Sequence, residues 1–375
     1  MAQPLSRRHF LGLSACSLAS AGLAPLLGAG GSARAQLPPT LPGMDDPDAV
    51  LLNYNENPLG PFPEAREAAL DGLGRANRYL FGLQRDLVGL FASQNGLRED
   101  QVAGYCGSGV ALDSAALAFA SPKAALVTAD PTFESLAQMA DAHGAPVARV
   151  PLRADGAHDV RAMAAAAEAG SAGLIYVCNP NNPTGSITPR ADIDWLLAHK
   201  PAGSVVLVDE AYIHYSDEPD TLDLVRAGAD VVVLRTFSKI YGMAGMRLGL
   251  AMARPELLQR LVLFGMNSLP VPSVAAGIAS LGHPQQLATR KAENTRLREE
   301  TVAWLAARGH ACLPSQANCF MVDVKGDGRA FTSAMARHKV FVGRSWPSMP
   351  QHVRVTVGTA EEMARFREAF AAVMA

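Results

Sequence analysis

Short, almost continuously apolar runs alternate with helix-like segments from about residue 100 onward. Runs of this kind, bounded by turn residues, are typical of strands that are buried on both faces. Strands that alternate with helices form a mostly parallel sheet covered by helices on both sides. The pattern therefore predicts an α/β fold, with strands at 124–130, 173–180, 204–212, 231–238 and 247–253.

Helices are expected between these runs, and the clearest candidates lie at 134–143, 160–169 and 188–200. The last should begin with Thr188 as its N-cap and Pro189 at the first helical position. Apolar runs at 318–324 and 352–358 indicate a second, smaller α+β unit near the C-terminus.

The first 35 residues have a different composition. Arg7 and Arg8 precede Phe10, and no charged residue occurs from Phe10 to Ser32. Small residues at Ala33 and Ala35 suit a signal peptidase, so residues 1–35 are predicted to be a twin-arginine export signal, cleaved after Ala35. The mature protein would then be periplasmic or otherwise exported. This route carries folded proteins, which suits a protein that loads a cofactor in the cytoplasm.

Three alternatives to a cleaved signal stay open. A membrane anchor would fit the length of the apolar stretch, but its many Gly, Ala and Ser residues and Pro25 make it only mildly hydrophobic. Lipidation at Cys16 is a second alternative, because "LSAC" resembles a lipobox. The third is a cytoplasmic protein.

The bulk composition excludes some classes of function. The chain has 375 residues, enough for two or three domains, and a formal net charge of −2, so no polyanion-binding surface is indicated. None of the five cysteines lies in a CxxC or a Cys/His cluster with metal-ligand spacing. Cys106 and Cys178 end apolar runs and are expected to be buried free thiols, although disulfides stay possible in an exported protein.

Polar residues at strand ends carry the candidate chemistry. Asp209 ends the run "VVLVD", where a carboxylate is costly unless it is paired, and a helix cap is the plainer alternative. Lys239 also follows a strand, and a solvated lysine would be its plainer interpretation. The hydroxyls and glycines around it favour an anion-binding turn instead, formed by Thr236, Ser238, Gly242, Gly245 and Arg247.

A second anion site is indicated by Gly107-Ser108-Gly109 ahead of an apolar helix, where backbone N–H groups and the helix dipole favour a phosphate. Taken alone, this tripeptide is more often just a turn. Together, the motifs fit a ligand with a phosphate, a carbonyl for Lys239 and a basic ring nitrogen for Asp209. Pyridoxal 5'-phosphate has all three groups.

Three segments resemble the class I/II aminotransferases of fold type I: "NPNNPTG" (179–185), "VDEAY" (208–212) and "TFSKIYGMAGMRLG" (236–249). The closest similarity is to the histidinol-phosphate aminotransferase group, and it extends from about residue 50 to the C-terminus. The resemblance implies a homodimer with a large cofactor-binding domain and a small domain. Residues 36–75 are predicted to form an N-terminal arm and part of the small domain. Residues 76–265 would form the large domain, and residues 266–375 the rest of the small domain.

The resemblance also implies a role for individual residues. Lys239 would form the aldimine with the cofactor and move the substrate proton, and Asp209 would pair with the ring nitrogen. The other implied cofactor contacts are Asn182 and Tyr212 at the ring 3-oxygen, Phe133 stacked on the ring, and Ser108, Gly109, Val110, Ser238 and Arg247 at the phosphate. Tyr79 would reach a phosphate bound in the partner subunit. The implied substrate contacts are Arg354 as a fork on the α-carboxylate, Asn57 and Arg344.

Two departures from the family pattern concern the site. Val110 stands where the family commonly has an acidic residue, which matters little if backbone N–H groups hold the phosphate. The segment 342–352 differs from the histidinol-phosphate version, with Arg344 as a possible second anion contact and Trp346 as a pocket wall. This difference leaves the identity of the amino substrate open, and the export signal suggests a substrate other than histidinol phosphate. If the substrate is histidinol phosphate, which lacks an α-carboxylate, Arg354 could bind its phosphate instead.

Other functions remain open at this stage. Decarboxylases, racemases and β-lyases use the same lysine and aspartate, although Arg354 favours transamination because it would protect the carboxylate. A binding protein without activity would not need to keep Lys239, Asp209 and Arg354 together. A nicotinamide-dependent dehydrogenase would need GxGxxG, and "GSGVAL" lacks the third glycine.

Overall fold

The computed structural model describes residues 41–265 and 268–375, and Pro42–Ala375 form one compact unit. The predicted export signal at 1–35, with its cleavage site and the alternative lipid site, lies outside the described residues. Within the described ranges, no helix has both the length and the apolar character needed to cross a membrane.

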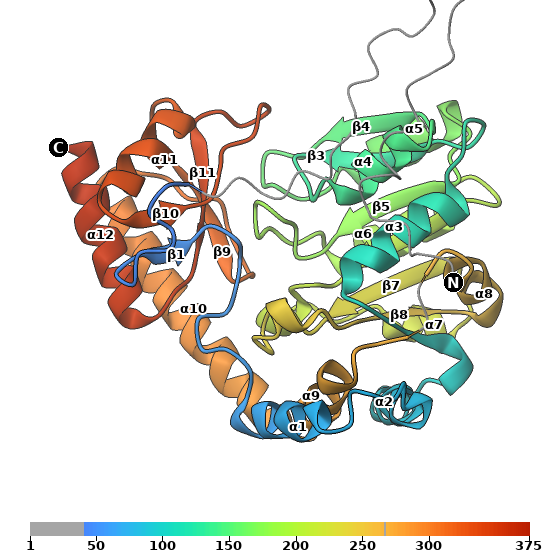
Figure 1. Ribbon diagram of the computed structural model, residues 1–375. Helices are drawn as coiled ribbons and strands as arrows, with labels where there is room; N and C mark the ends of the chain where they lie inside the picture. Colours follow the sequence, from blue (N-terminus) through green and yellow to red (C-terminus); the bar gives the residue numbers. More distant parts are fainter. Residues whose placement is uncertain (1–40, 266–267) are drawn as a thin grey trace, which may run out of the picture. The chain divides into compact units, whose positions relative to one another are not determined.

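A seven-stranded sheet forms the centre of the fold, in the order β2-β8-β7-β6-β5-β3-β4 (Figure 1). Every pair from β7 to β4 is parallel, and only β8 runs antiparallel to its neighbours β7 and β2. The strands are β2 (Val102–Tyr105), β3 (Leu126–Asp130), β4 (Val147–Pro151), β5 (Leu174–Cys178), β6 (Val205–Asp209), β7 (Val231–Thr236) and β8 (Gly249–Ala253). The prediction of a mostly parallel α/β sheet is confirmed.

Each face of this sheet packs against its own set of helices. Successive strand residues point to opposite faces, so Val206 and Val208 enter one hydrophobic cluster and Val205 and Leu207 enter the other. The first face is covered by α1 (Pro63–Leu73), α2 (Phe81–Gln94), α5 (Val160–Ala169), α6 (Arg190–His199), α7 (Leu222–Arg226) and α9 (Val271–Leu281). The second is covered by α3 (Ser108–Phe119), α4 (Ser135–Ala142) and α8 (Pro255–Val262).

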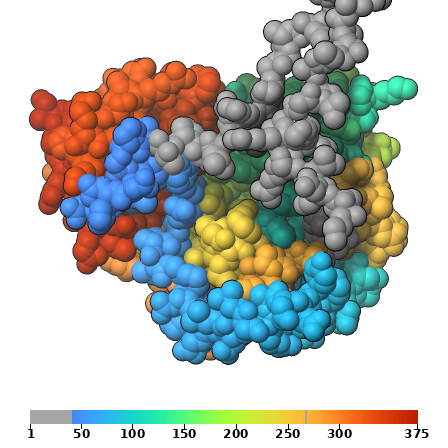
Figure 2. Space-filling view, in the orientation of Figure 1, coloured from blue at the N-terminus to red at the C-terminus, as the bar shows by residue number. Residues whose placement is uncertain are grey.

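A third hydrophobic cluster joins the N-terminal segment to the C-terminal part of the chain. β1 (Val50–Leu52) pairs in parallel with β10 (Val340–Val342), and β9 (Cys319–Asp323) pairs antiparallel with β11 (His352–Thr356). The helices of this part are α10 (Pro284–Ala306), α11 (Gly328–Arg337) and α12 (Ala360–Met374). Figure 2 shows the blue N-terminal residues against the orange and red C-terminal ones on the face in view. The predicted domain divisions stay a prediction.

In the part of the chain that the structure describes, three short 3-10 helices lie in connecting segments: η1 (Glu99–Gln101), η2 (Ile213–Tyr215) and η3 (Ala244–Met246). One predicted boundary is wrong by one residue, because α6 begins at Arg190 with Pro189 as its N-cap. The Thr188 hydroxyl does not cap this helix; it accepts a hydrogen bond from the His158 backbone N–H (3.1 Å) and lies 2.8 Å from His158 Nδ1. The four described cysteines are all free thiols, and Cys178 is buried whereas Cys106 is half-buried.

Candidate active site

A cavity of about 330 Å³ opens where β6 and β7 end and α3 begins. Parallel strands bring their carboxyl ends to one edge of the sheet, and residues far apart in sequence meet there. The predicted residues that line this cavity are Ser108, Gly109, Phe133, Asn182, Asp209, Tyr212, Ser238, Lys239, Arg247 and Arg354. The structure therefore brings together most of the residues that the sequence singled out.

Lys239 is half-buried and follows the last residue of β7 by three positions. Its Nζ donates hydrogen bonds to the carbonyls of Asn55 (3.0 Å) and Tyr54 (3.3 Å), and it lies 5.5 Å from the centroid of the Tyr212 ring. Burial, with the nearby Arg354 guanidinium, lowers the pKa of Lys239 to about 8. The neutral, nucleophilic amine is therefore accessible near neutral pH.

Asp209 is the last residue of β6 and is only 3% exposed. Its carboxylate accepts hydrogen bonds from the Tyr176 hydroxyl and from the Ala211 backbone N–H, each at 3.1 Å. Burial raises the pKa of Asp209 to about 6, although these hydrogen bonds and the Lys239 charge oppose the shift. A buried carboxylate with this environment would be stabilised by a cationic ring nitrogen.

The opposite end of the cavity has the features of a phosphate site. Ser108 and Gly109 open α3, where the first backbone N–H groups have no acceptor within the helix. Arg247 Nη1 donates to Ser238 Oγ at 3.3 Å, which places a cation and a hydroxyl together. Gly107, with φ of +87°, leaves room for that cation, because an added Cβ would collide with the Arg247 guanidinium.

Arg354 lies on β11 and brings a further cation to the cavity. Its Nη1 donates to Asn182 Oδ1 (2.7 Å) and its Nη2 to the Asn53 carbonyl. Its Nε is buried and has no hydrogen-bond partner among the described residues. A buried donor of this kind is costly unless it is satisfied, and a carboxylate oxygen would satisfy it.

The remaining predicted residues lie outside this cavity. The Val110 N–H donates to the Gly107 carbonyl at 3.2 Å, so it serves the first turn of α3 rather than a ligand. Tyr79 is 72% exposed and stacks on Phe81 with ring centroids 5.5 Å apart. The Arg344 guanidinium pairs with Glu134 and lies 4.4 Å from the centroid of the Trp346 ring.

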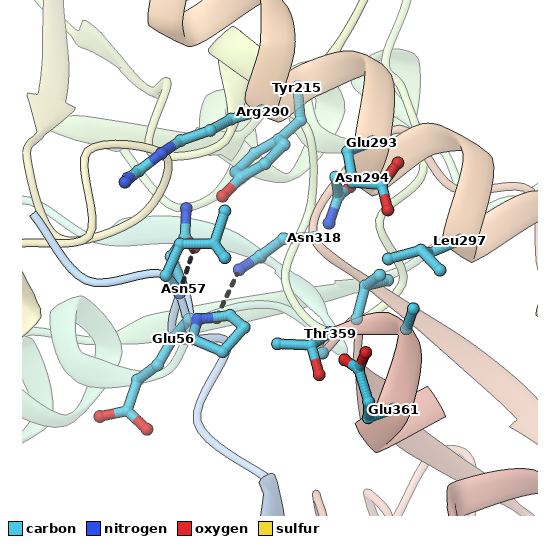
Figure 3. Close-up of a pocket in the computed structure, with 15 residues that line it drawn as sticks. Glu56, Asn57, Tyr215, Arg290, Glu293, Asn294, Leu297, Asn318, Thr359 and Glu361 are labelled. Carbon is cyan, nitrogen blue, oxygen red and sulfur yellow. Dashed lines mark hydrogen bonds between the residues drawn. The ribbon is translucent and has the colours of Figure 1, made fainter. Parts of the chain in front are cut away.

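Asn57 lines a second cavity of about 330 Å³, between the segment 56–59, α10 and the start of α12 (Figure 3). Its Nδ2 donates to the Ile240 carbonyl at 3.0 Å. Arg290 in the wall of this cavity donates to the same carbonyl and to that of Gly60, at 2.8 and 2.7 Å. Both side chains therefore tie the N-terminal segment to the turn after Lys239.

Several residues of the site were missed by the sequence interpretation. Tyr176 lies inside a predicted strand, where nothing distinguishes its hydroxyl from an ordinary core residue. Asn55 uses its Nδ2 to reach the Tyr212 hydroxyl at 3.1 Å, and Glu56 lines the cavity beside it. Both belong to the segment "LNYNENPLGP" (52–61), near the start of the region of family resemblance.

Residues 41–265 and 268–375 contain no group of three or more His, Cys, Asp or Glu side chains arranged to hold a metal ion. The sheet carries a lysine, a carboxylate and an arginine beside a helix N-terminus at its carboxyl edge, as in enzymes of the fold type I α/β class. The sequence pattern of the family "aminotransferase class I and II" matches residues 47–370. The chain belongs to this family and is an aminotransferase.

Relatives with known names agree with this assignment. A histidinol-phosphate aminotransferase of Symbiobacterium thermophilum is 38% identical over 338 residues, which cover 87% of this chain and 91% of the relative. An aromatic amino acid aminotransferase of Rhodococcus jostii is 35% identical over 335 residues, covering 87% and 90%. The solved structure of histidinol-phosphate aminotransferase from Sinorhizobium meliloti in complex with pyridoxal-5'-phosphate is also similar. It aligns with a TM-score of 0.80 and 25% identity, covering 87% of this chain and 91% of that one.

Proposed function

We propose that this chain is a pyridoxal-phosphate-dependent aminotransferase, which moves an amino group from an amino acid or amine to a 2-oxo acid. The observation that carries the proposal is one cavity that combines the Lys239 amine, the buried Asp209 carboxylate and the phosphate site at Ser238 and Arg247. Pyridoxal phosphate supplies an aldehyde for the amino group and a conjugated ring that accepts electrons from the substrate Cα.

The residues of the cavity can hold each part of this cofactor. The Ser108 and Gly109 N–H groups, the Ser238 hydroxyl and Arg247 would bind the phosphate. Asp209 would pair with the ring nitrogen, Phe133 would cover the ring, and Asn182 and Tyr212 would reach the 3-oxygen. Arg247 and the helix dipole together compensate a phosphate dianion without a metal ion.

Lys239 would carry the proton that leaves the substrate Cα. Two backbone carbonyls aim its Nζ, and its lowered pKa of about 8 makes the neutral amine available as a base. The rigid strand that precedes it limits its movement, which is an advantage for a group that must return the same proton to a neighbouring atom.

Arg354 would bind the substrate carboxylate through its unsatisfied Nε. A carboxylate held in this way is retained in the product, which favours transamination over decarboxylation. The assignment of Arg354 thus separates this function from decarboxylation, which uses the same lysine.

The functional unit is proposed to be a homodimer, with Tyr79 reaching the phosphate of the partner subunit. Tyr79 and Phe81 form an exposed aromatic pair, and Leu263 and Phe264 are exposed as well. Exposed aromatic side chains in such numbers are typical of contact surfaces. Analytical ultracentrifugation checks this, and a monomer at micromolar concentration would contradict it.

The chain is further proposed to be exported through the twin-arginine route, on the basis of Arg7, Arg8 and the uncharged stretch after them. N-terminal sequencing of the secreted protein should begin at Gln36. A mature protein that begins at Met1 and stays in the cytoplasm would contradict this proposal.

The decisive experiment is an absorbance spectrum of the protein with pyridoxal phosphate, before and after addition of single amino donors. The wild type should show a visible band that disappears with a good donor and returns with a 2-oxo acid. Lys239→Ala should lose this band and all turnover while its circular dichroism stays unchanged, and exposed Lys123→Ala should behave as the wild type. Turnover by Lys239→Ala would refute the assignment, and release of carbon dioxide by the wild type would favour a decarboxylase.

A further inference from the structure

The charged side chains of the active cavity leave an unassigned pair once the cofactor contacts are counted. Its charged lining residues are Glu56, Asp209, Lys239, Arg247 and Arg354. Arg247, Asp209 and Lys239 serve the phosphate, the ring nitrogen and the reacting carbon in the proposed function. Arg354 and Glu56 remain, one cation and one anion, to meet the substrate.

Glu56 is exposed at the mouth of the cavity, and its carboxylate has no hydrogen-bond or ion-pair partner within the described part of the chain. Its charge raises the pKa of Lys239, so it acts within electrostatic reach of the reacting amine. Figure 3 shows its side chain directed away from Asn294 and Leu297 on α10. Glu56 contributes to the walls of both cavities, and its unpaired carboxylate is available to a ligand.

The backbone around Glu56 is held firmly on both sides. Asn318 Nδ2 donates to the carbonyls of Asn55 (3.0 Å) and Glu56 (3.3 Å). Asn57 Nδ2 donates to the Ile240 carbonyl at 3.0 Å. A carboxylate on a fixed backbone loses less entropy when it binds a ligand than one on a mobile loop.

The nearby arginines are engaged elsewhere. Arg344 pairs with Glu134, and Arg290 donates to two backbone carbonyls and lies 4.2 Å from the Phe62 ring centroid. Among the described residues that line the cavity, no cation is left to compensate a second anionic group on the substrate. A phosphate or a distal carboxylate would also be repelled by Glu56.

We infer that the amino donor is a monocarboxylic amino acid whose side chain ends in a cation, with Arg354 on its carboxylate and Glu56 on that cation. This inference rests on the proposed function and names its substrate class. Glu56 is thus a specificity-determining residue, and donors with two anionic groups are disfavoured. Arg354 and Glu56 would each bind one charged end of the donor, and the cofactor would lie between these two residues.

The test compares kcat/KM of the holoenzyme for L-arginine, L-ornithine, L-norleucine, L-glutamate and histidinol phosphate. Arginine or ornithine should exceed norleucine by about tenfold, because a charge-assisted hydrogen bond at an exposed carboxylate contributes a modest free energy. Glu56→Gln should remove this advantage and leave norleucine within about twofold of the wild type. Glu293→Gln, which changes a carboxylate of the second cavity only, should leave all donors unchanged.

A binding measurement separates recognition from turnover. The desamino analogue of arginine should raise the Tm of the holoenzyme more than hexanoate does, and Glu56→Gln should abolish the difference. Best turnover with histidinol phosphate or glutamate, or an equal loss for all donors in Glu56→Gln, would overturn the inference. Absence of turnover with every donor would instead refute the proposed function, and the analogue titration would still decide whether Glu56 selects a cation.

Discussion

The ion pair between Arg235 and Glu210 gives the sharpest prediction about stability. Glu210 follows Asp209 and is 1% exposed, and its Oε2 accepts from Arg235 Nε at 3.0 Å. Its Oε1 accepts from the Thr221 backbone N–H (2.7 Å) and hydroxyl (2.8 Å). Arg235, on β7, reaches Asp220 with Nη2 at 2.7 Å. Replacement of Arg235 by Met keeps the aliphatic stem and removes the guanidinium, with its charge and its N–H donors.

The expected cost follows from this geometry. Without the guanidinium, the Glu210 carboxylate keeps two neutral donors but loses its only contacting cation among the described residues. Breaking a buried pair in this way costs about 3–5 kcal/mol of unfolding free energy. For a chain of this size that corresponds to a fall in Tm of roughly 4–6 °C. Burial already raises the pKa of Glu210 with Arg235 present, so the variant should be most destabilised at high pH, where the carboxyl is charged.

Urea unfolding of Arg235→Met, Glu210→Gln and the double variant measures this effect. The double variant should regain part of the loss, because a neutral amide no longer needs the cation. Arg149→Met is the matched control, since its bridge to Asp141 joins side chains that are 48% and 52% exposed and should be worth less than about 1 kcal/mol. A loss below about 1 kcal/mol for Arg235→Met, equal to that of the control, would refute the reasoning.

Two further predictions concern the phosphate site and pH. Gly107→Ala should weaken pyridoxal phosphate binding about tenfold or more, because the methyl meets the Arg247 guanidinium and φ is +87°. Gly203→Ala, at φ +83° with open space around it, isolates the backbone strain, and equal affinity in both variants would contradict the steric argument. Burial lowers the pKa of His158 from 6.5 to about 3, so the unfolded state binds an extra proton between these values. Stability should therefore fall as the pH is lowered through this window, by up to about 1.4 kcal/mol per pH unit. His158→Asn should flatten the slope of unfolding free energy against pH, whereas exposed His338→Asn should not.

The central strands could be predicted because they are buried on both faces and leave long apolar runs. β2 and β4 were not predicted, and both lie at the edges of the sheet. β4 is mostly solvent-accessible and includes Arg149, so its composition does not separate it from a loop. The four residues of β2 include Gly104, where an added Cβ would collide with the Leu269 side chain. In the sequence alone, a glycine at this position predicts a turn rather than a strand. Edge strands are specified by their neighbours more than by their own sequence.

The residues of the site also divide into those that the sequence could predict and those that it could not. Asp209, Ser238 and Lys239 could be predicted because each lies at the end of a recognisable strand or just after it. The position of Arg344 could not, because its partner Glu134 lies 210 residues away and only the fold brings them together. The carbonyls that hold Lys239 carry no side-chain signal at all, since every residue has one.

Asn55 connects these distant parts and explains why the cavity works as a unit. It adopts a φ of +54°, which Asn tolerates better than most residues, and this turns its carbonyl toward Lys239 Nζ. Its N–H donates to Thr356 Oγ1 at 3.0 Å, two residues beyond Arg354 on β11. Its Nδ2 reaches the Tyr212 hydroxyl. One residue of the N-terminal segment is thus hydrogen-bonded to Lys239, to the strand that carries Arg354 and to Tyr212. Asn55 therefore links β11, Lys239 and Tyr212 through three hydrogen bonds, and none of these contacts is visible in the sequence around Lys239.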